Sequence, residues 1–230
     1  MKNMSKILLI IFLLKSITSY EKQGIDLNSK HEEVNWSLIS KKDFDFAIIN
    51  IGSRLIIPKG EKLVIDKYFT RNYKGGKERG LKIGGTWYNY AKNIKQAEKE
   101  AKSCLNIVKK YKFEYPIFYI FPHMELLNTG KNNVILVAKT FCDYLIKNKI
   151  LCGFFAFPNI IEDYFDEDLK NNYPIWIQDH KEGESNYKGK WGIRQYTHFG
   201  HINNWGYNVH KDISIVDYFK IIKEGHFNGY

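Results

Sequence analysis

The sequence predicts an α/β fold with a largely parallel sheet. Three apolar runs, residues 43–51, 115–121 and 150–157, are rich in β-branched and aromatic side chains. Such runs are typical of strands that are buried on both faces of a parallel sheet. Residues 93–111 and 134–145 carry apolar side chains three and four positions apart, which predicts amphipathic helices. Strands that alternate with helices indicate βαβ units.

The first part of the chain predicts shorter elements. Residues 24–28 are expected to form a short strand, and residues 34–39 a short helix. Residues 52–62 are basic and show no clear period, so we expect a loop there. Asp66 is a suitable cap and Gly80 a suitable stop for a helix between them.

The later elements continue the alternation and then lose it. Residues 83–91 are expected to form the third strand, and Pro158 opens a short helix that reaches about Leu169. Beyond it, residues 174–178 and 192–196 and a stretch near Val209 predict strands without a helical period between them. The whole pattern is five strand–helix units followed by three strands.

The first 19 residues have the order of a secretory signal. Two lysines precede the apolar stretch 7–14, and small polar residues follow as far as Ser19. Eight apolar residues are too few to cross a bilayer core of about 30 Å. We therefore expect cleavage near Ser19, a single mature domain over residues 20–230, and a location outside the cell or in a lysosome-like vesicle.

The charge of the mature chain is positive. Removing the three lysines of the signal from the formal charge of +10 leaves +7. The lysines are scattered singly, which is typical of a solvated basic surface that also favours approach to anionic bacterial walls. No nucleic-acid motif is present, so a nucleic-acid partner is not expected. We expect a monomer with no transmembrane segment and no cofactor.

Three cysteines allow at most one bridge within the chain. Cys104 and Cys142 lie on the apolar stripes of successive helices, which predicts a bridge or close contact between them. Cys152, in a buried strand, is then the free thiol. Asn35-Trp-Ser37 is a glycosylation sequon, so Asn35 is a candidate acceptor.

Several short pieces occur in a characteristic order. They are Gly24-Ile-Asp-Leu-Asn28, Val34-Asn-Trp36, Phe46-Ala-Ile-Ile-Asn50, the segment 80–91, Tyr115-Pro-Ile-Phe-Tyr119, Tyr173-Pro-Ile-Trp176 and Gln195-Tyr196. In this order they resemble glycoside hydrolase family 25, the lysozymes or muramidases, over most of the mature chain. The resemblance implies one irregular TIM-like (β/α) barrel of five β/α units followed by three strands, with its site at the carboxyl ends of the strands.

The resemblance also implies which residues perform the chemistry. The family has an Asp-x-Glu pair at the end of the fourth strand, with Glu as general acid, and these positions are Ile120 and Pro122 here. The family's late Asp corresponds to His210, so the first-strand acid Asp26 is the family acid that this chain retains. Glycoside hydrolysis needs a proton donor for the leaving oxygen and a second group for the developing cation. We therefore expect a divergent member whose hydrolysis is impaired or lost.

Two alternatives stay open. Glu125 could act as a substitute acid in an active muramidase, although three extended residues separate it from Pro122 by roughly 10 Å. A protein-interaction or toxin-like scaffold is the other alternative. Among the histidines, His198 and His201 form the tightest pair, but their spacing matches no zinc motif, so no metal is expected.

Aromatic residues make up 16% of the chain and gather at the predicted carboxyl ends of strands. Sugar rings stack on aromatic faces and bond to polar tips, so we expect the cleft to bind a peptidoglycan- or chitin-type oligosaccharide around Asp26. Thr86 and Arg194 stand where relatives often have Tyr and Trp. The expected binding residues are Tyr88, Tyr90, Trp176 and Tyr196.

Overall fold

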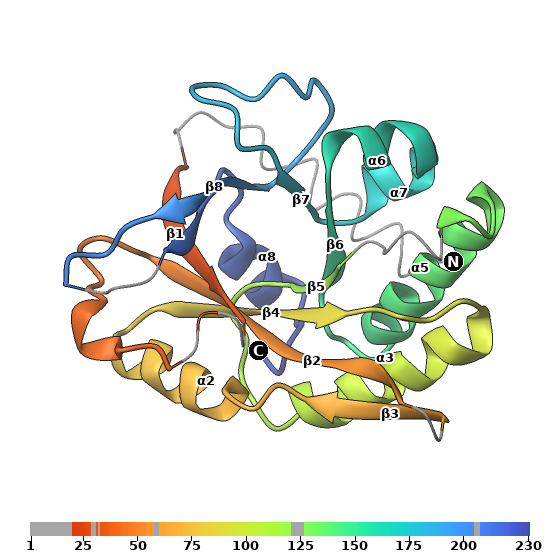
Figure 1. Cartoon of the computed structure of the whole chain (residues 1–230), viewed down its shortest axis with the longest axis horizontal. Coiled ribbons are helices and arrows are strands. Elements are labelled where there is room, and N and C mark those ends of the chain that lie inside the picture. The colour runs from red at the N-terminus through yellow and green to blue at the C-terminus, as the bar shows by residue number, and fades with distance from the viewer. Residues whose placement is uncertain (1–19, 29–30, 32, 58–59, 121–126, 205–207) are drawn as a thin grey trace.

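The strands form one closed barrel with an attached hairpin (Figure 1). The computed structural model describes residues 20–28, 31, 33–57, 60–120, 127–204 and 208–230. Within this part the strands are β1 (Lys22–Leu27), β2 (Phe46–Ile57), β3 (Gly60–Ile65), β4 (Lys82–Tyr88), β5 (Ile117–Ile120), β6 (Cys152–Ala156), β7 (Ile175–Gln178), β8 (Ile193–Gly200) and β9 (Val209–Ser214). Their order is β1-β9-β8-β7-β6-β5-β4-β2-β3, and pairing of β1 with β2 closes eight of them into a barrel.

The barrel is parallel over most of its circumference. The pairs from β1 through β2, β4, β5, β6 and β7 to β8 are parallel, whereas β9 runs antiparallel to both of its neighbours. The carboxyl ends of the parallel strands therefore meet at one mouth of the barrel.

Helices cover the outside of this barrel. They are the 3₁₀ helix η2 (Trp36–Leu38) and the α-helices α2 (Phe69–Glu78), α3 (Ile94–Val108), α5 (Lys131–Lys147), α6 (Pro158–Tyr164), α7 (Glu167–Asn172) and α8 (Tyr218–Glu224). Figure 1 shows α3 and α5 side by side, and they are in contact. The predicted five β/α units followed by three strands are confirmed. Within the described ranges, no helix combines the length and apolarity that crossing a membrane requires.

Side chains of opposite faces of the strands build two apolar clusters. Ala47, Ile49 and Ile83 belong to the outer cluster beneath the helices. Phe46, Phe118 and Ile193 belong to the inner cluster, which fills the barrel. Alternate residues of a strand point to opposite sides, so every continuous apolar run serves both clusters.

Helix α8 was not predicted, and it closes the amino-terminal end of the barrel. Its residues Tyr218, Ile221 and Ile222 pack into the inner cluster. Asp217 caps the helix by accepting a hydrogen bond from the Lys220 amide at 3.0 Å. Seven residues are too few to show a clear helical period, so tertiary packing stabilises this helix more than local propensity does.

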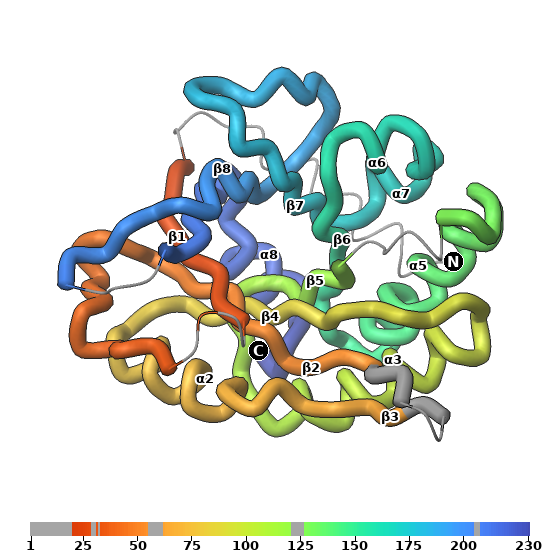
Figure 2. The backbone as a smooth tube through the Cα atoms, in the orientation of Figure 1, coloured from red at the N-terminus to blue at the C-terminus, as the bar shows by residue number. Residues whose placement is uncertain are grey.

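The predicted loop at residues 52–62 is wrong. Strand β2 runs on past the barrel wall and returns as β3, forming the antiparallel ribbon that Figure 2 follows along the chain. Pairing of the two strands satisfies backbone groups that a loop would leave to water. Gly52 permits their close approach, because a Cβ at this position would lie 2.3 Å from the Val64 carbonyl oxygen.

The single helix predicted from Pro158 to Leu169 is two helices, α6 and α7. Asp166 lies between them in an extended conformation, and its side chain accepts a hydrogen bond from the Leu169 amide at 2.8 Å. A capping aspartate starts a new helix instead of continuing the old one.

The predicted Cys104–Cys142 disulfide is also wrong, since all three cysteines are free and buried. Cys142 lies beside Cys152 of β6 instead of forming a bridge, and the two sulfurs are 2.7 Å apart. Burial raises the pKa values of the Cys104 and Cys142 thiols well above their usual range. These thiols are therefore unreactive core groups at neutral pH.

Candidate functional site

A polar pocket of about 180 Å³ opens at the carboxyl ends of the parallel strands. It combines a carboxylate, amides and an imidazole with apolar side chains. Its polar lining is Asp26, Asn28, Thr86, Tyr88, Gln178, Gln195 and His210, and its apolar lining is Leu27, Ile120, Phe155 and Trp176. Concave sites with a few convergent polar groups at this end of a barrel are the usual place for ligand chemistry.

Asp26 is the centre of this pocket. Its side chain is held from two sides: the Gln195 amide nitrogen donates to Oδ2 at 2.7 Å, and Nδ1 of His210 donates to Oδ1 at 2.9 Å. His210 stands directly opposite Asp26 in the β1–β9 pairing. The carboxylate is therefore fixed in orientation between Gln195 and His210.

Asp212 lies deeper on the same face of β9. It stands opposite Gly24, is fully buried, and accepts a hydrogen bond from Nε1 of Trp176 at 2.9 Å. Burial, then the charge of Asp26 and a hydrogen bond to it, raise the pKa of Asp212 well above its usual range. The buried site therefore favours the protonated, neutral form of Asp212.

We expect Asp212→Asn to stabilise the protein increasingly as pH rises from about 4 to 7. Because the pKa of Asp212 is raised in the folded state, its contribution to stability is fully present below the unfolded pKa of about 3.9. This contribution is lost as pH rises toward the folded pKa. Asn keeps the shape of the neutral acid and has no proton to lose in either the folded or the unfolded state.

Urea unfolding at pH 4 and pH 7 measures the effect. The exposed acid Asp43, replaced by Asn, is the matched control. A difference between Asp212→Asn and wild type that is equal at both pH values would show that Asp212 ionises normally.

Tyr88 and Asn28 form another part of the pocket wall, and His31 lies next to Asn28. Burial, followed by the charge of Asp26, raises the pKa of Tyr88 to about 12, so its hydroxyl stays protonated at neutral pH. The backbone amide of Asn28 donates to Nδ1 of His31 at 3.0 Å, and the His31 ring meets His210 edge-on with centroids 4.6 Å apart. Tyr88 can therefore serve both as an apolar face and as a hydrogen-bond donor.

The structure brings only some of the predicted binding residues together. Tyr88 and Trp176 line the pocket, but Trp176 is 1% exposed and forms its floor. Tyr196 is outside the lining, and its hydroxyl donates to Gln23 at 3.3 Å. Tyr90 is outside the lining too, with its backbone amide bonded to Glu100.

Of the family's acid positions, Ile120 lines the pocket and His210 contacts Asp26. Pro122 and Glu125 lie outside the described residues.

Arg194 also lies outside the pocket lining. Its guanidinium donates to three backbone carbonyls of the loop after β7, those of Asp179 (2.8 Å), Lys181 and Gly183. Arg194 therefore shapes the rim of the mouth through the loop and does not contact the pocket itself.

Other residues at the mouth were missed by sequence reasoning. Gln195 belongs to a piece that carried the resemblance, but nothing marked its side chain as a partner of Asp26. His31 and His180 belong to no recognisable sequence motif. The one available signal was the number of histidines, seven in the chain, of which four gather here: His31, His180, His198 and His210.

Two further predicted features concern modification and metals. Asn35 is exposed, and its Oδ1 accepts hydrogen bonds from the Ser37 amide and hydroxyl at 3.2 and 2.7 Å. Glycosylation of Asn35 stays a prediction. In the part of the chain that the structure describes, no three His, Cys, Asp or Glu side chains are placed to hold a metal ion.

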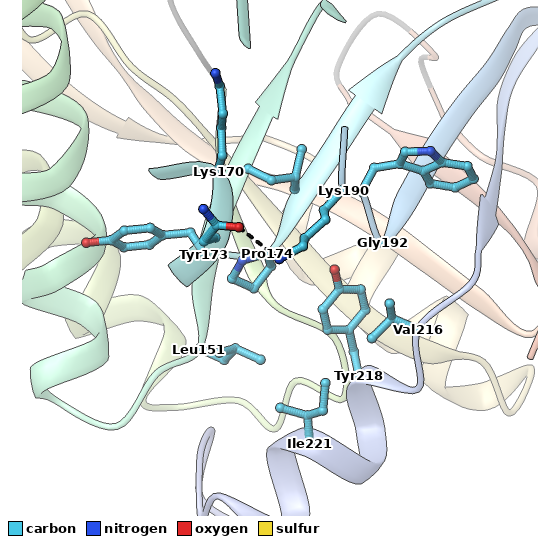
Figure 3. Close-up of a pocket in the computed structure, with 12 residues that line it drawn as sticks. Leu151, Lys170, Tyr173, Pro174, Lys190, Gly192, Val216, Tyr218 and Ile221 are labelled. Atoms are coloured by element: carbon cyan, nitrogen blue, oxygen red, sulfur yellow. Dashed lines mark hydrogen bonds between the residues drawn. The ribbon is translucent and has the colours of Figure 1, made fainter. Parts of the chain in front are cut away.

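A second pocket lies at the opposite end of the barrel, between the starts of β7 and β8 and helix α8 (Figure 3). It is smaller, about 90 Å³, and mainly apolar, with walls that include Leu151, Pro174 and Ile221. The hydroxyl of Tyr218 points toward Gly192, where a Cβ would meet it at 1.9 Å. Its place at the amino-terminal ends of the strands separates it from Asp26 and from the usual location of barrel chemistry.

A closed, mostly parallel barrel with a carboxylate-centred pocket at its carboxyl mouth defines a (β/α)-barrel of the glycosidase type. The profile of the Glycosyl hydrolases family 25 matches residues 25–205, and the chain belongs to this family.

Relatives and solved structures agree with this assignment. The uncharacterized protein YegX of Escherichia coli strain K12 is 25% identical over 220 residues, covering 90% of this chain and 73% of YegX. The catalytic domain of endolysin ply40 from bacteriophage P40 of Listeria monocytogenes has a TM-score of 0.73 at 16% identity, covering 90% of this chain and 99% of that domain.

The modular autolysin LytC from Streptococcus pneumoniae, in complex with a synthetic peptidoglycan ligand, has a TM-score of 0.71 at 20% identity. The match covers 86% of this chain but 47% of LytC, so this chain spans about half of the length of that protein. At these identities the structural likeness establishes the fold.

Proposed function

We propose that the protein is an exported family 25 barrel that binds an amino-sugar glycan of the peptidoglycan or chitin type and hydrolyses it slowly or not at all. The observation that carries the proposal is the composition of the pocket around Asp26. Asp26, Asn28, Gln178 and Gln195 supply polar groups for hydroxyl and acetamido groups, and Tyr88 supplies an aromatic face.

Impaired hydrolysis follows from the residues at the family's acid positions. Ile120 lines the pocket and can neither donate a proton nor stabilise a cation. Asp212 favours its protonated form, but it is fully buried and accepts a hydrogen bond from Trp176, so it does not reach a glycosidic oxygen. His210 is engaged with Asp26 through Nδ1. Glycan binding depends instead on the polar groups of the pocket and on the ring of Tyr88, which these changes leave in place.

Export is proposed from the first 19 residues, which have the order of a secretory signal. The mature charge of +7 supports a role at anionic cell walls, because a positive surface raises the local concentration of such a polymer.

Replacing Tyr88 by Ala is expected to weaken glycan binding about tenfold, the equivalent of about 1.4 kcal/mol, through loss of the stacking face. Isothermal titration with chitin and peptidoglycan oligosaccharides measures it. Tyr88→Phe keeps the ring and should retain most of the affinity, and Tyr144→Phe on α5, away from the mouth, is the matched control. If wild type binds neither glycan at millimolar concentration, the protein-interaction scaffold becomes the better explanation.

A further inference from the structure

A line of hydrogen bonds connects Asp26 to the rim of the mouth. The Gln195 amide bonds to Asp26 at 2.7 Å and to Nε2 of His180 at 2.8 Å, and Nδ1 of His180 lies 2.6 Å from Nδ1 of His198. These four groups come from β1, β8 and the segment after β7, so barrel closure alone assembles them. His198 is the outermost member and is partly exposed.

The chemistry of each group determines where the protons lie. An ionised carboxylate only accepts, so Gln195 turns its NH₂ to Asp26 and its carbonyl oxygen to His180. His180 then carries its proton on Nε2 and accepts on Nδ1. His198 must donate from Nδ1, which makes its second nitrogen, Nε2, a hydrogen-bond acceptor. A buried carboxylate thus selects the tautomer of a histidine at the rim.

An exposed aromatic ring lies next to His198. Phe199 is 63% exposed, and its ring centroid lies 3.8 Å from that of His198. The amide of Phe199 donates to the Thr197 hydroxyl at 3.0 Å, which orders the backbone there. The His198 ring lies 6.5 Å from that of His210, which lines the pocket. A sugar next to one bound in the pocket therefore comes within reach of His198 and Phe199.

We propose that His198 and Phe199 form a second sugar subsite at the rim, in which Phe199 stacks on the apolar face of a pyranose and Nε2 of His198 accepts a hydrogen bond from its hydroxyl or acetamido N–H. The subsite rests on the proposed function, because it extends a glycan whose first unit occupies the Asp26 pocket. Its ligand is an amino-sugar oligomer longer than the pocket alone accommodates. An aromatic face and one oriented acceptor are the two elements that sugar recognition requires.

Oligosaccharides of different length separate the subsite from the pocket. We expect chitotetraose to bind wild type more tightly than chitobiose, and Phe199→Ala to lower tetrasaccharide affinity about tenfold while leaving disaccharide affinity unchanged. The matched control is Leu136→Ala, an exposed apolar residue on α5 that is 50% exposed. His198→Phe should also lose tetrasaccharide affinity, whereas His198→Gln, which can accept through its amide oxygen, should recover part of it.

The outcomes distinguish the subsite from the proposed function. If wild type binds both sugars and Phe199→Ala binds the tetrasaccharide as wild type does, the subsite is refuted and glycan binding stands. If wild type binds neither sugar, both proposals fail. Nitrogen-15 NMR of the imidazoles checks the proton assignment independently: we expect His198 protonated on Nδ1, and protonation on Nε2 alone would overturn its role as acceptor.

Discussion

Purified mature protein is expected to clear bacterial cell walls at least about 10²-fold more slowly than a family 25 lysozyme with its acids intact. Loss of the general acid alone typically removes a factor of about 10² to 10⁴, and we propose that the assisting carboxylate is lost as well. Ile120, which we assign by resemblance to the position of that carboxylate, lines the pocket with an apolar side chain. Turbidity of a peptidoglycan suspension and reducing-end release both measure the rate.

Two variants determine the cause of the low rate. The double change Ile120→Asp and Pro122→Glu restores the family's pair, and it should raise the rate above wild type if the rest of the pocket is competent. Glu125→Gln tests the substitute acid. A wild-type rate near that of an intact relative would contradict the proposal, and its loss in Glu125→Gln would identify Glu125 as the acid.

Glu100→Ala is expected to lower the free energy of unfolding by about 3–5 kcal/mol, because it removes one member of a buried ion pair. Glu100 on α3 is fully buried, and its carboxylate accepts from Nε1 of Trp87 at 2.9 Å and from the Tyr90 amide at 3.3 Å. Arg54, on β2 and 2% exposed, lies 3.7 Å away. The carboxylate thereby joins the helix, the strand β4 and the base of the hairpin.

Thermal unfolding gives the size of this effect. At about 2–4 °C per kcal/mol for a chain of this length, the midpoint should fall by roughly 6–20 °C. Glu98→Ala on the same helix removes an exposed acid and should change stability by no more than about 0.5 kcal/mol. A loss below about 1 kcal/mol in Glu100→Ala would mean that the buried ion pair contributes little to stability.

The stability of this network has a functional consequence. Trp87 belongs to β4, and Tyr90 follows this strand. The same strand carries Tyr88 into the pocket. Loosening of the Glu100 contacts should therefore weaken glycan binding as well as stability. The glycan affinity of Glu100→Ala, measured below its unfolding temperature and compared with that of Tyr88→Ala, separates the effect on binding from the effect on stability.

The linear sequence determined the order of the main elements. Long periodic segments such as α3 and α5 were predicted because burial of an apolar stripe imposes a local spacing that can be counted. Asp26 was also readable, since it depends only on position within a short piece, and it lies in the pocket. The assignment of Ile120 and Pro122 to the family's acid positions stays a prediction. Short or strongly charged elements, α8 and the β2–β3 hairpin, left no such spacing and were missed.

Only the tertiary structure decided how the mouth is built. Gln195 and Asp26 are 169 residues apart, and they meet because closure of the barrel puts β1 and β8 on either side of β9. The same closure gathers His180, His198 and His210, and the packing of α5 on the sheet places Cys142 beside Cys152. Burial follows a local pattern along the chain, whereas contacts between side chains depend on strand register and helix rotation, which no single segment encodes.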